Sequence, residues 1–271
     1  MRRSVLPEHV VSPTKCALVY FSPTDGTRAV VSAIAEGFSD LTCMHIDMTL
    51  PAHRAQDYEL GEDTLLVLGF PVYYGRVPLI QEEILPRLLG KARYALPVVV
   101  YGNRAYEDSL RELGDLCCQK GYELAAAAAF IAEHSYSAEM GTKRPDDMDR
   151  ALARQFGAAV ISSLQEGKTL DCASLPGNVP YKIYGPKPPI VPSFQESCTT
   201  GCNVCADLCP TRAISDDGRT IDEQRCILCA ACIKKCPFQA RFIDSVLMRE
   251  RIQAMAAANR GQKQPQLFLP G

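Results

Sequence analysis

The sequence contains no tryptophan, so aromatic stacking on a ligand must come from tyrosine. It also lacks an excess of one charge, because 29 basic residues stand against 31 acidic ones. Balanced charge argues against nucleic acid and against an anionic membrane surface as partners. The partner must therefore be inferred from individual sites.

A secretory signal is not expected from the sequence either. The N-terminal segment is interrupted by Pro7, Glu8 and His9 before an apolar stretch of signal length can form. No later apolar run approaches the ~20 residues of a membrane span. We therefore expect a cytoplasmic protein without membrane insertion.

Cysteine, in contrast, is abundant, and eight of the 13 cysteines lie between positions 198 and 236. This clustering indicates a metal site and not a disulfide framework. Free cysteine is commonly a small buried apolar residue. We expect this of the five scattered ones, which are Cys16, Cys43, Cys117, Cys118 and Cys172.

The first 167 residues alternate between two kinds of pattern. Short buried apolar runs predict strands at 16–21, 41–48, 64–70, 96–101 and 124–132. Helical patterns occur at 28–38, 79–89, 106–120 and 146–164. This alternation predicts an α/β fold with a parallel sheet covered by helices on both faces. Ligands of such sheets bind beyond the carboxyl ends of the strands.

The remaining sequence divides by composition. Residues 168–197 form a linker with six prolines, which acts either as a semi-rigid strap or as a mere tether. The cysteine-rich segment occupies 198–240. In 241–271 we expect a helix over 243–258 that packs on one domain, followed by a frayed tail.

The second half of the cysteine-rich segment has the spacing C-x2-C-x2-C-x3-C-P, ending at Cys236 and Pro237. This spacing is typical of iron–sulfur proteins. Three thiolates on one tight turn reach one cubane, while the displaced fourth points toward a second cluster. When two such motifs are present, each therefore supplies the fourth ligand of the other motif's cluster. The rule assigns Cys198, Cys202, Cys205 and Cys236 to a first 4Fe-4S cluster, and Cys226, Cys229, Cys232 and Cys209 to a second. A zinc site is the alternative. Zinc needs only four ligands per metal, so it would not explain the reciprocal fourth cysteine.

Residues 198 to about 240 resemble the two-cluster bacterial ferredoxins, including the segment from Cys209-Pro to Ile214. The resemblance implies a small α+β domain. This sequence departs from the family pattern by three residues between Cys198 and Cys202, where two are usual. Gly201 can absorb the extra residue in a left-handed or bulged conformation.

Three loops follow predicted strands in the first domain. The first, Ser22-Pro-Thr-Asp-Gly-Thr27, opens a helix and offers the hydroxyls of Ser22, Thr24 and Thr27. Such a loop is either a phosphate site or a plain helix N-cap. The second reads Gly69-Phe-Pro-Val-Tyr-Tyr-Gly-Arg-Val-Pro78, and the third reads Tyr101-Gly-Asn-Arg-Ala-Tyr-Glu-Asp108. Their tyrosines suit a flat heteroaromatic ring.

These three loops resemble the FMN loops of flavodoxins. With the cysteine segment included, residues 15 to 240 resemble bacterial fusions of a flavodoxin-like domain with a ferredoxin domain. The resemblance implies a five-stranded parallel sheet of order 2-1-3-4-5 and a bound FMN. It carries over Ser22, Thr24, Gly26 and Thr27 as phosphate ligands, Tyr73 and Tyr74 as ring contacts, and Gly102, Asn103, Arg104 and Tyr106 as the lining of the third loop.

Asp25 stands where flavodoxins usually have glycine. A carboxylate about 5 Å from a phosphate charge would cost roughly 3 kcal/mol at an effective dielectric of ~20. We therefore expect the Asp25 side chain to point away, as a helix cap, or to weaken phosphate binding. His134, after the last strand, either faces the flavin or is a hydrogen-bonded structural residue.

A flavin handles one or two electrons, whereas a cubane handles one, so a protein with both is suited to convert between them. We therefore expect an oxidoreductase or electron carrier that works with a redox partner protein. No catalytic triad or Cys/His arrangement is present, so no catalytic residue is predicted. Two alternatives are a ferredoxin whose flavodoxin-shaped domain lacks FMN and serves docking or regulation, and a terminal flavin-dependent reductase of a small molecule.

Overall fold

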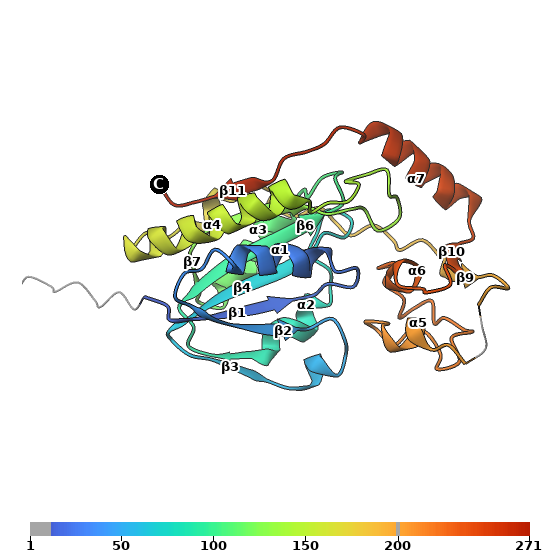
Figure 1. The fold of residues 1–271 in the computed structure, drawn as a ribbon, viewed down its shortest axis with the longest axis horizontal. Coiled ribbons are helices and arrows are strands. Elements are labelled where there is room, and N and C mark those ends of the chain that lie inside the picture. Colours follow the sequence, from blue (N-terminus) through green and yellow to red (C-terminus); the bar gives the residue numbers. More distant parts are fainter. Residues whose placement is uncertain (1–11, 199–200) are drawn as a thin grey trace, which may run out of the picture.

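The structure is a computed structural model and describes residues 12–198 and 201–271. An α/β domain holds the N-terminal part of the sequence, and the cysteine-rich segment lies beyond one end of its sheet (Figure 1). The expected α/β fold is confirmed. The two parts touch, so the loops at that end of the sheet are framed by both.

The sheet contains the five predicted strands in parallel. They are β1 (Lys15–Tyr20), β2 (Thr42–Asp47), β4 (Thr64–Pro71), β6 (Tyr94–Tyr101) and β8 (Ala127–Ile131). Their spatial order, β2-β1-β4-β6-β8, is the expected order 2-1-3-4-5. This is the doubly wound order of flavodoxins. A short β7 (Glu123–Leu124) also pairs with β6, and β3 (Tyr58–Leu60) pairs with β5 (Leu88–Gly90) outside the main sheet.

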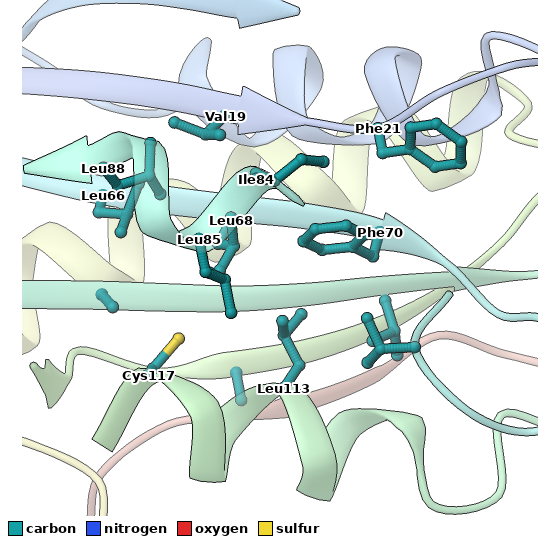
Figure 2. Close-up of a cluster of buried hydrophobic side chains, with 14 of the residues drawn as sticks. Val19, Phe21, Leu66, Leu68, Phe70, Ile84, Leu85, Leu88, Leu113 and Cys117 are labelled. Atoms are coloured by element: carbon teal, nitrogen blue, oxygen red, sulfur yellow. The ribbon is translucent and has the colours of Figure 1, made fainter. Parts of the chain in front are cut away.

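Two apolar layers cover the faces of the sheet. On one face α1 (Gly26–Ala35) packs with α4 (Asp147–Gln165), which begins with a capping box at Asp146 and Asp149. A Cβ on Gly157 would lie 2.1 Å from the Ile34 carbonyl oxygen, so glycine permits this close approach. On the other face α3 (Ser109–Gln119) and α2 (Gln81–Ile84) cover the sheet. Figure 2 shows side chains of these helices, such as Ile84 and Leu113, in one apolar cluster with strand side chains such as Phe70.

The prediction of a helix over 79–89 is wrong for most of that range. Only α2 forms, followed by the 3-10 turn η2 (Leu85–Arg87) and by β5. Pro86 explains the break, because proline has no N–H donor and its ring clashes with the preceding turn.

The C-terminal segment also differs from expectation. The helix α7 (Val246–Ala258) forms and begins at the N-cap Ser245, but the segment after it is not frayed. It returns to the α/β domain as β11 (Gln266–Phe268), which pairs antiparallel with β8 (Figure 1). The tail therefore covers one edge of the sheet.

The proline-rich linker is docked on the α/β domain, as expected of a strap and not of a tether. Asp108, buried, accepts hydrogen bonds from the backbone N–H of Asn178 at 2.8 Å and of Lys182 at 2.7 Å. Arg76 forms an ion pair with Glu112 at 2.7 Å and stacks on two tyrosines of the linker, Tyr181 and Tyr184.

Two of the five scattered cysteines are not free, which corrects the expectation for them. Cys118 at the end of α3 is joined to Cys172 in η3 (Cys172–Ser174) by a disulfide. The linker passes beside the end of α3 at this point, which brings two cysteines 54 residues apart in sequence together. Cys16, Cys43 and Cys117 are free, and two of them, Cys16 and Cys117, are buried.

The cysteine-rich part is small. It contains α5 (Val204–Asp207), α6 (Ala231–Lys234) and a two-stranded sheet of β9 (Pro192–Phe194) and β10 (Arg241–Ile243).

A further 3-10 turn, η1 (His53–Ala55), follows β2 in the α/β domain. Among the residues that the structure describes, no helix is long and apolar enough to cross a membrane.

Candidate flavin and iron–sulfur site

The first loop joins β1 to α1 at the carboxyl end of the sheet. The buried Ser22 hydroxyl accepts a hydrogen bond from the Arg28 backbone N–H at 3.0 Å. The bond from Ala29 N–H to the Asp25 carbonyl opens the helix, so the N–H groups of Gly26 and Thr27 have no acceptor inside it. Within the described part of the protein the loop thus presents helix N–H groups without an acceptor, as a phosphate site requires.

Close packing also explains why position 26 is a glycine. A Cβ at this position would lie 2.8 Å from the Ala132 Cβ. Thr27 is buried and Thr24 half-buried. The loop residues predicted to bind phosphate therefore lie together, although Ser22 and Gly26 also serve the fold.

Asp25 does not cap the helix with its side chain, which corrects that expectation. Its backbone is left-handed, with φ of 66°, and no side-chain cap bond forms. The left-handed conformation is one that glycine adopts without strain. The carboxylate turns toward the cysteine-rich part, where Lys235 Nζ lies 3.1 Å from it. Arg28 is a second cation at 3.6 Å.

The second loop presents Tyr73 and Tyr74 toward the second motif. Burial raises the pKa of Tyr73 well above its usual value, and the neighbouring Cys229 adds to the rise. Burial also raises the pKa of Tyr74, with Cys226 as the second cause. Tyr74 remains 46% exposed and has a left-handed φ of 57°. Both tyrosines therefore lie between the α/β domain and the cysteines.

The third loop is held by the C-terminal tail. The buried Asn103 side chain donates to the carbonyls of Asn259 at 2.8 Å and Gly261 at 2.9 Å, and accepts from the Lys263 N–H at 3.2 Å. The Lys263 ammonium also donates to the Arg104 carbonyl. Sequence reasoning missed this use of Asn103, because the tail has no strong pattern that predicts a strand.

The other members of the third loop also have partners within the protein. Tyr106 donates to Gln266 in β11 and packs edge-on against Tyr101 with ring centroids 5.5 Å apart. Arg104 forms an ion pair with Glu107. A Cβ on Gly102 would lie 2.4 Å from His134 Cδ2, so this glycine makes room for the imidazole.

A fourth loop, after β8, completes the rim. The Tyr136 N–H donates to His134 Nδ1 at 3.1 Å, which places the ring proton on Nε2. Burial lowers the pKa of His134 to about 4, so the ring is neutral at pH 7. The Tyr136 hydroxyl donates to the Leu228 carbonyl, inside the second cysteine motif. His134 was noticed in the sequence, but only the structure identifies Tyr136 as a contact.

The second motif surrounds a cavity together with one cysteine of the first. Cys226, Cys229, Cys232 and Cys209 line it, with Ile214, Ile221 and other apolar residues. This is the set of four that the reciprocal spacing rule predicts. Burial raises the pKa of Cys229 and raises that of Cys232 to about 12, so these thiols lie in a poorly hydrated place, where the positive charge of bound iron ions would stabilise their thiolates.

The first set of cysteines is more open. Cys198, Cys202, Cys205 and Cys236 are each half-buried. Gly201 has a left-handed φ of 83°, the conformation expected to absorb the extra residue, while Thr199 and Thr200 lie outside the described residues. In residues 12–198 and 201–271 no group of three or more His, Cys, Asp or Glu side chains is close enough together to hold a metal ion.

Hydrogen bonds to sulfur occur at both sets. The Ala213 N–H donates to Cys209 Sγ at 3.2 Å, and the Ala240 N–H donates to Cys236 Sγ at 3.3 Å. The Arg241 guanidinium donates to Cys205 Sγ at 3.3 Å. Such bonds stabilise thiolates and tune the potential of a cluster. The donor set therefore suits sulfur-ligated iron.

Further contacts join the two parts around the rim. Arg54, buried after β2, donates to the Pro210 carbonyl at 2.5 Å, directly after Cys209. Lys234 pairs with Glu133 at 2.5 Å. Ile227 packs against the apolar core of the α/β domain. The cysteine-rich part therefore rests on the carboxyl end of the sheet, and the Asp25–Lys235 pair joins it to the first of the loops predicted to bind a flavin.

Comparisons with known proteins agree with this division. A family described as "4Fe-4S binding domain" matches residues 219–242. A subunit of the polysulfide reductase of Wolinella succinogenes is 38% identical over 56 residues, which cover 19% of this protein and 29% of that subunit. The match thus spans less than a third of that relative.

The solved structures that resemble this protein cover its N-terminal part. A flavodoxin from the domain Archaea is 13% identical, with a TM-score of 0.38, and the match covers 56% of this protein and 99% of that one. An NAD(P)H:quinone oxidoreductase from Methanothermobacter marburgensis is 14% identical, with a TM-score of 0.37 and coverages of 57% and 97%. The strand order, and not these scores, identifies the fold. The protein joins a flavodoxin-like α/β domain to a 4Fe-4S binding domain, a combination suited to electron transfer.

Proposed function

We propose that this protein carries electrons between an FMN in the α/β domain and two 4Fe-4S clusters in the cysteine-rich domain. The observation that carries this proposal is the contact of Tyr136 with Leu228. It brings the rim of a flavodoxin-like sheet against the turn that bears Cys226 and Cys229. An FMN at this rim would lie across one interface from the nearer cluster, an arrangement that suits electron transfer.

The residues of the rim have distinct roles in this proposal. The first loop, with Ser22, Thr24, Gly26 and Thr27, holds the phosphate. Tyr73 and Tyr74 contact the ring from the second loop, and the third loop, from Gly102 to Tyr106, lines its other side. FMN supplies a centre that exchanges one or two electrons, whereas each cluster exchanges one.

The order of the centres follows from the contacts. Cys229 adds to the rise that burial causes in the pKa of Tyr73, and Ile227 packs on the α/β core. The cluster of Cys226, Cys229, Cys232 and Cys209 is therefore the one next to the flavin. The cluster of Cys198, Cys202, Cys205 and Cys236 is the outer one and exchanges electrons with a partner protein.

The test begins with composition. Anaerobically purified protein should contain about one FMN and eight irons per polypeptide. The Tyr136→Phe variant keeps the ring and loses the hydrogen bond to Leu228, so reduction of the clusters by photoreduced flavin should slow while both contents stay the same. Tyr122→Phe, far from the rim, is the matched control. Cluster reduction that is independent of the flavin would contradict the proposal.

A second candidate is a ferredoxin whose α/β domain docks partners without FMN. It is favoured by Asn103, whose side chain is taken up by three hydrogen bonds to the tail, and by the carboxylate of Asp25 in the phosphate loop. Iron at eight per polypeptide without flavin, and no flavin uptake from solution, would establish this candidate and refute the first.

A further inference from the structure

The two halves of the iron–sulfur domain repeat each other after their last cysteine. The first reads Cys209-Pro-Thr-Arg-Ala-Ile214 and the second Cys236-Pro-Phe-Gln-Ala-Arg241. The repeat is also structural, because the alanine N–H donates to the sulfur four residues earlier in both halves, at 3.2 and 3.3 Å. Residues at equivalent places in the repeat can therefore be compared directly.

The residue after this alanine differs between the halves. Ile214 is buried and lines the cavity of the second cluster, as an apolar residue beside a cluster would. Its counterpart is Arg241, which is only 4% exposed. A buried arginine stands where the repeat predicts an aliphatic side chain.

Arg241 is incompletely paired. Its Nη2 donates to Cys205 Sγ at 3.3 Å and to the Gly218 carbonyl, and its guanidinium lies over the Phe194 ring at 5.2 Å. The buried Nε and Nη1 atoms have no hydrogen-bond partner in the described part of the protein. No carboxylate in residues 12–198 and 201–271 pairs with this cation.

A buried cation without a counter-ion is costly. Cys205 belongs to the first set of ligands, and a 4Fe-4S cluster with four thiolate ligands is an anion that gains one more negative charge on reduction. Such a cluster would supply the missing counter-charge and acceptors for the free N–H groups. The cation would in turn stabilise the reduced form, because attraction grows with the negative charge of the cluster.

We propose that Arg241 sets the potential of the first cluster above that of the second, and so directs electrons from the second cluster to the first. The step moves one electron from the second cluster to the first, with no bond made or broken. The inference rests on the proposed pair of clusters but not on FMN. It assigns a role to a residue that is no cluster ligand.

The experiment is an anaerobic redox titration of the holoprotein followed by electron paramagnetic resonance. The two signals are assigned first with Cys236→Ala and Cys209→Ala. The Arg241→Gln variant keeps an N–H donor but loses the charge. In this variant the equilibrium constant for electron transfer from the second cluster to the first should fall at least tenfold. Tenfold corresponds to about 59 mV for one electron. Arg241→Lys should give a smaller shift, because it keeps the charge without the planar fork.

Two further variants test whether the effect is specific to a cation beside the first cluster. Arg251→Gln removes the same charge from an exposed position on α7 and should leave both potentials unchanged. Ile214→Arg places the cation at the equivalent position of the other half and should raise the potential of the second cluster. Iron content is measured in every variant.

The outcomes separate this inference from the proposed function. Eight irons with unchanged potentials in Arg241→Gln, or with equal shifts of both clusters, would overturn the role of Arg241 alone. Protein that holds only the second cluster would overturn both, since Arg241 would then have no cluster beside it. Flavin content has no influence on either result.

Discussion

Asp25 and Lys235 form an ion pair at 3.1 Å between the first loop of the flavodoxin-like domain and the second cysteine motif. The pair connects two positions 210 residues apart in sequence. It gives the carboxylate in the loop predicted to bind phosphate a cationic partner. The loop and the iron–sulfur domain are therefore coupled through charge as well as through packing.

This pair predicts an effect of Lys235 on flavin binding. In Lys235→Ala the Asp25 charge loses its partner, so the affinity for FMN should fall about fivefold to tenfold, roughly 1 kcal/mol, because the side chains are partly exposed and screened. Asp25→Gly should raise the affinity and abolish the effect of the lysine change. Titration of the apoprotein with FMN by fluorescence quenching measures this, and equal losses with and without Asp25 would disprove the coupling.

The reciprocal ligand scheme predicts which cluster each cysteine supports. Cys236→Ala should damage the first cluster and leave the second, whereas Cys209→Ala should do the reverse. Iron analysis and electron paramagnetic resonance distinguish the two cases. If each substitution instead removes the cluster bound by the other three cysteines of its own motif, each motif holds its own cluster and the reciprocal scheme is wrong. Cys117→Ala, a buried cysteine outside both sets, is the control.

The tail predicts a dependence of the third loop on Asn103. Asn103→Ala removes three hydrogen bonds to residues 259–263, so tail docking should weaken by about 1–3 kcal/mol. Hydrogen exchange in β11 should then accelerate and FMN affinity should fall. Gln262→Ala, exposed in the same tail, should change neither. Unaltered exchange in β11 would show that strand pairing alone holds the tail.

The docked linker predicts a pH dependence of stability. Burial raises the pKa of Asp108, but hydrogen bonds from Asn178 and Lys182 outweigh it and lower the pKa below its usual value. A lowered carboxyl pKa stabilises the fold above the unfolded pKa of about 3.9, and this contribution disappears as the pH falls through the folded pKa.

Asp108→Asn should therefore cost about 2 kcal/mol at pH 7, a cost that stays constant down to about pH 5 and declines below about pH 4. Urea denaturation followed by circular dichroism measures it. The exposed Asp216→Asn serves as control. A difference that grows on acidification would contradict this assignment.

Some expectations failed for local reasons. Pro86 stopped a helix whose apolar periodicity had continued to 89. Cys118 and Cys172 are paired although cysteine distribution indicated no disulfides, since their encounter depends on the course of the linker. Asp25 could not cap α1, because a left-handed residue directs its side chain away from the helix N–H groups.

The parallel strands, most of their helices and the cysteine spacing were determined by the sequence alone, because buried apolar periodicity and ligand spacing are local properties of a polypeptide. The docking of the linker, the antiparallel tail strand and the contacts of Asp25, Asn103 and Tyr136 were decided only by the tertiary structure. These contacts join segments with no local pattern over separations of up to 210 residues. The same holds for Arg241, which resembles one more surface cation in the sequence until the fold buries it beside Cys205.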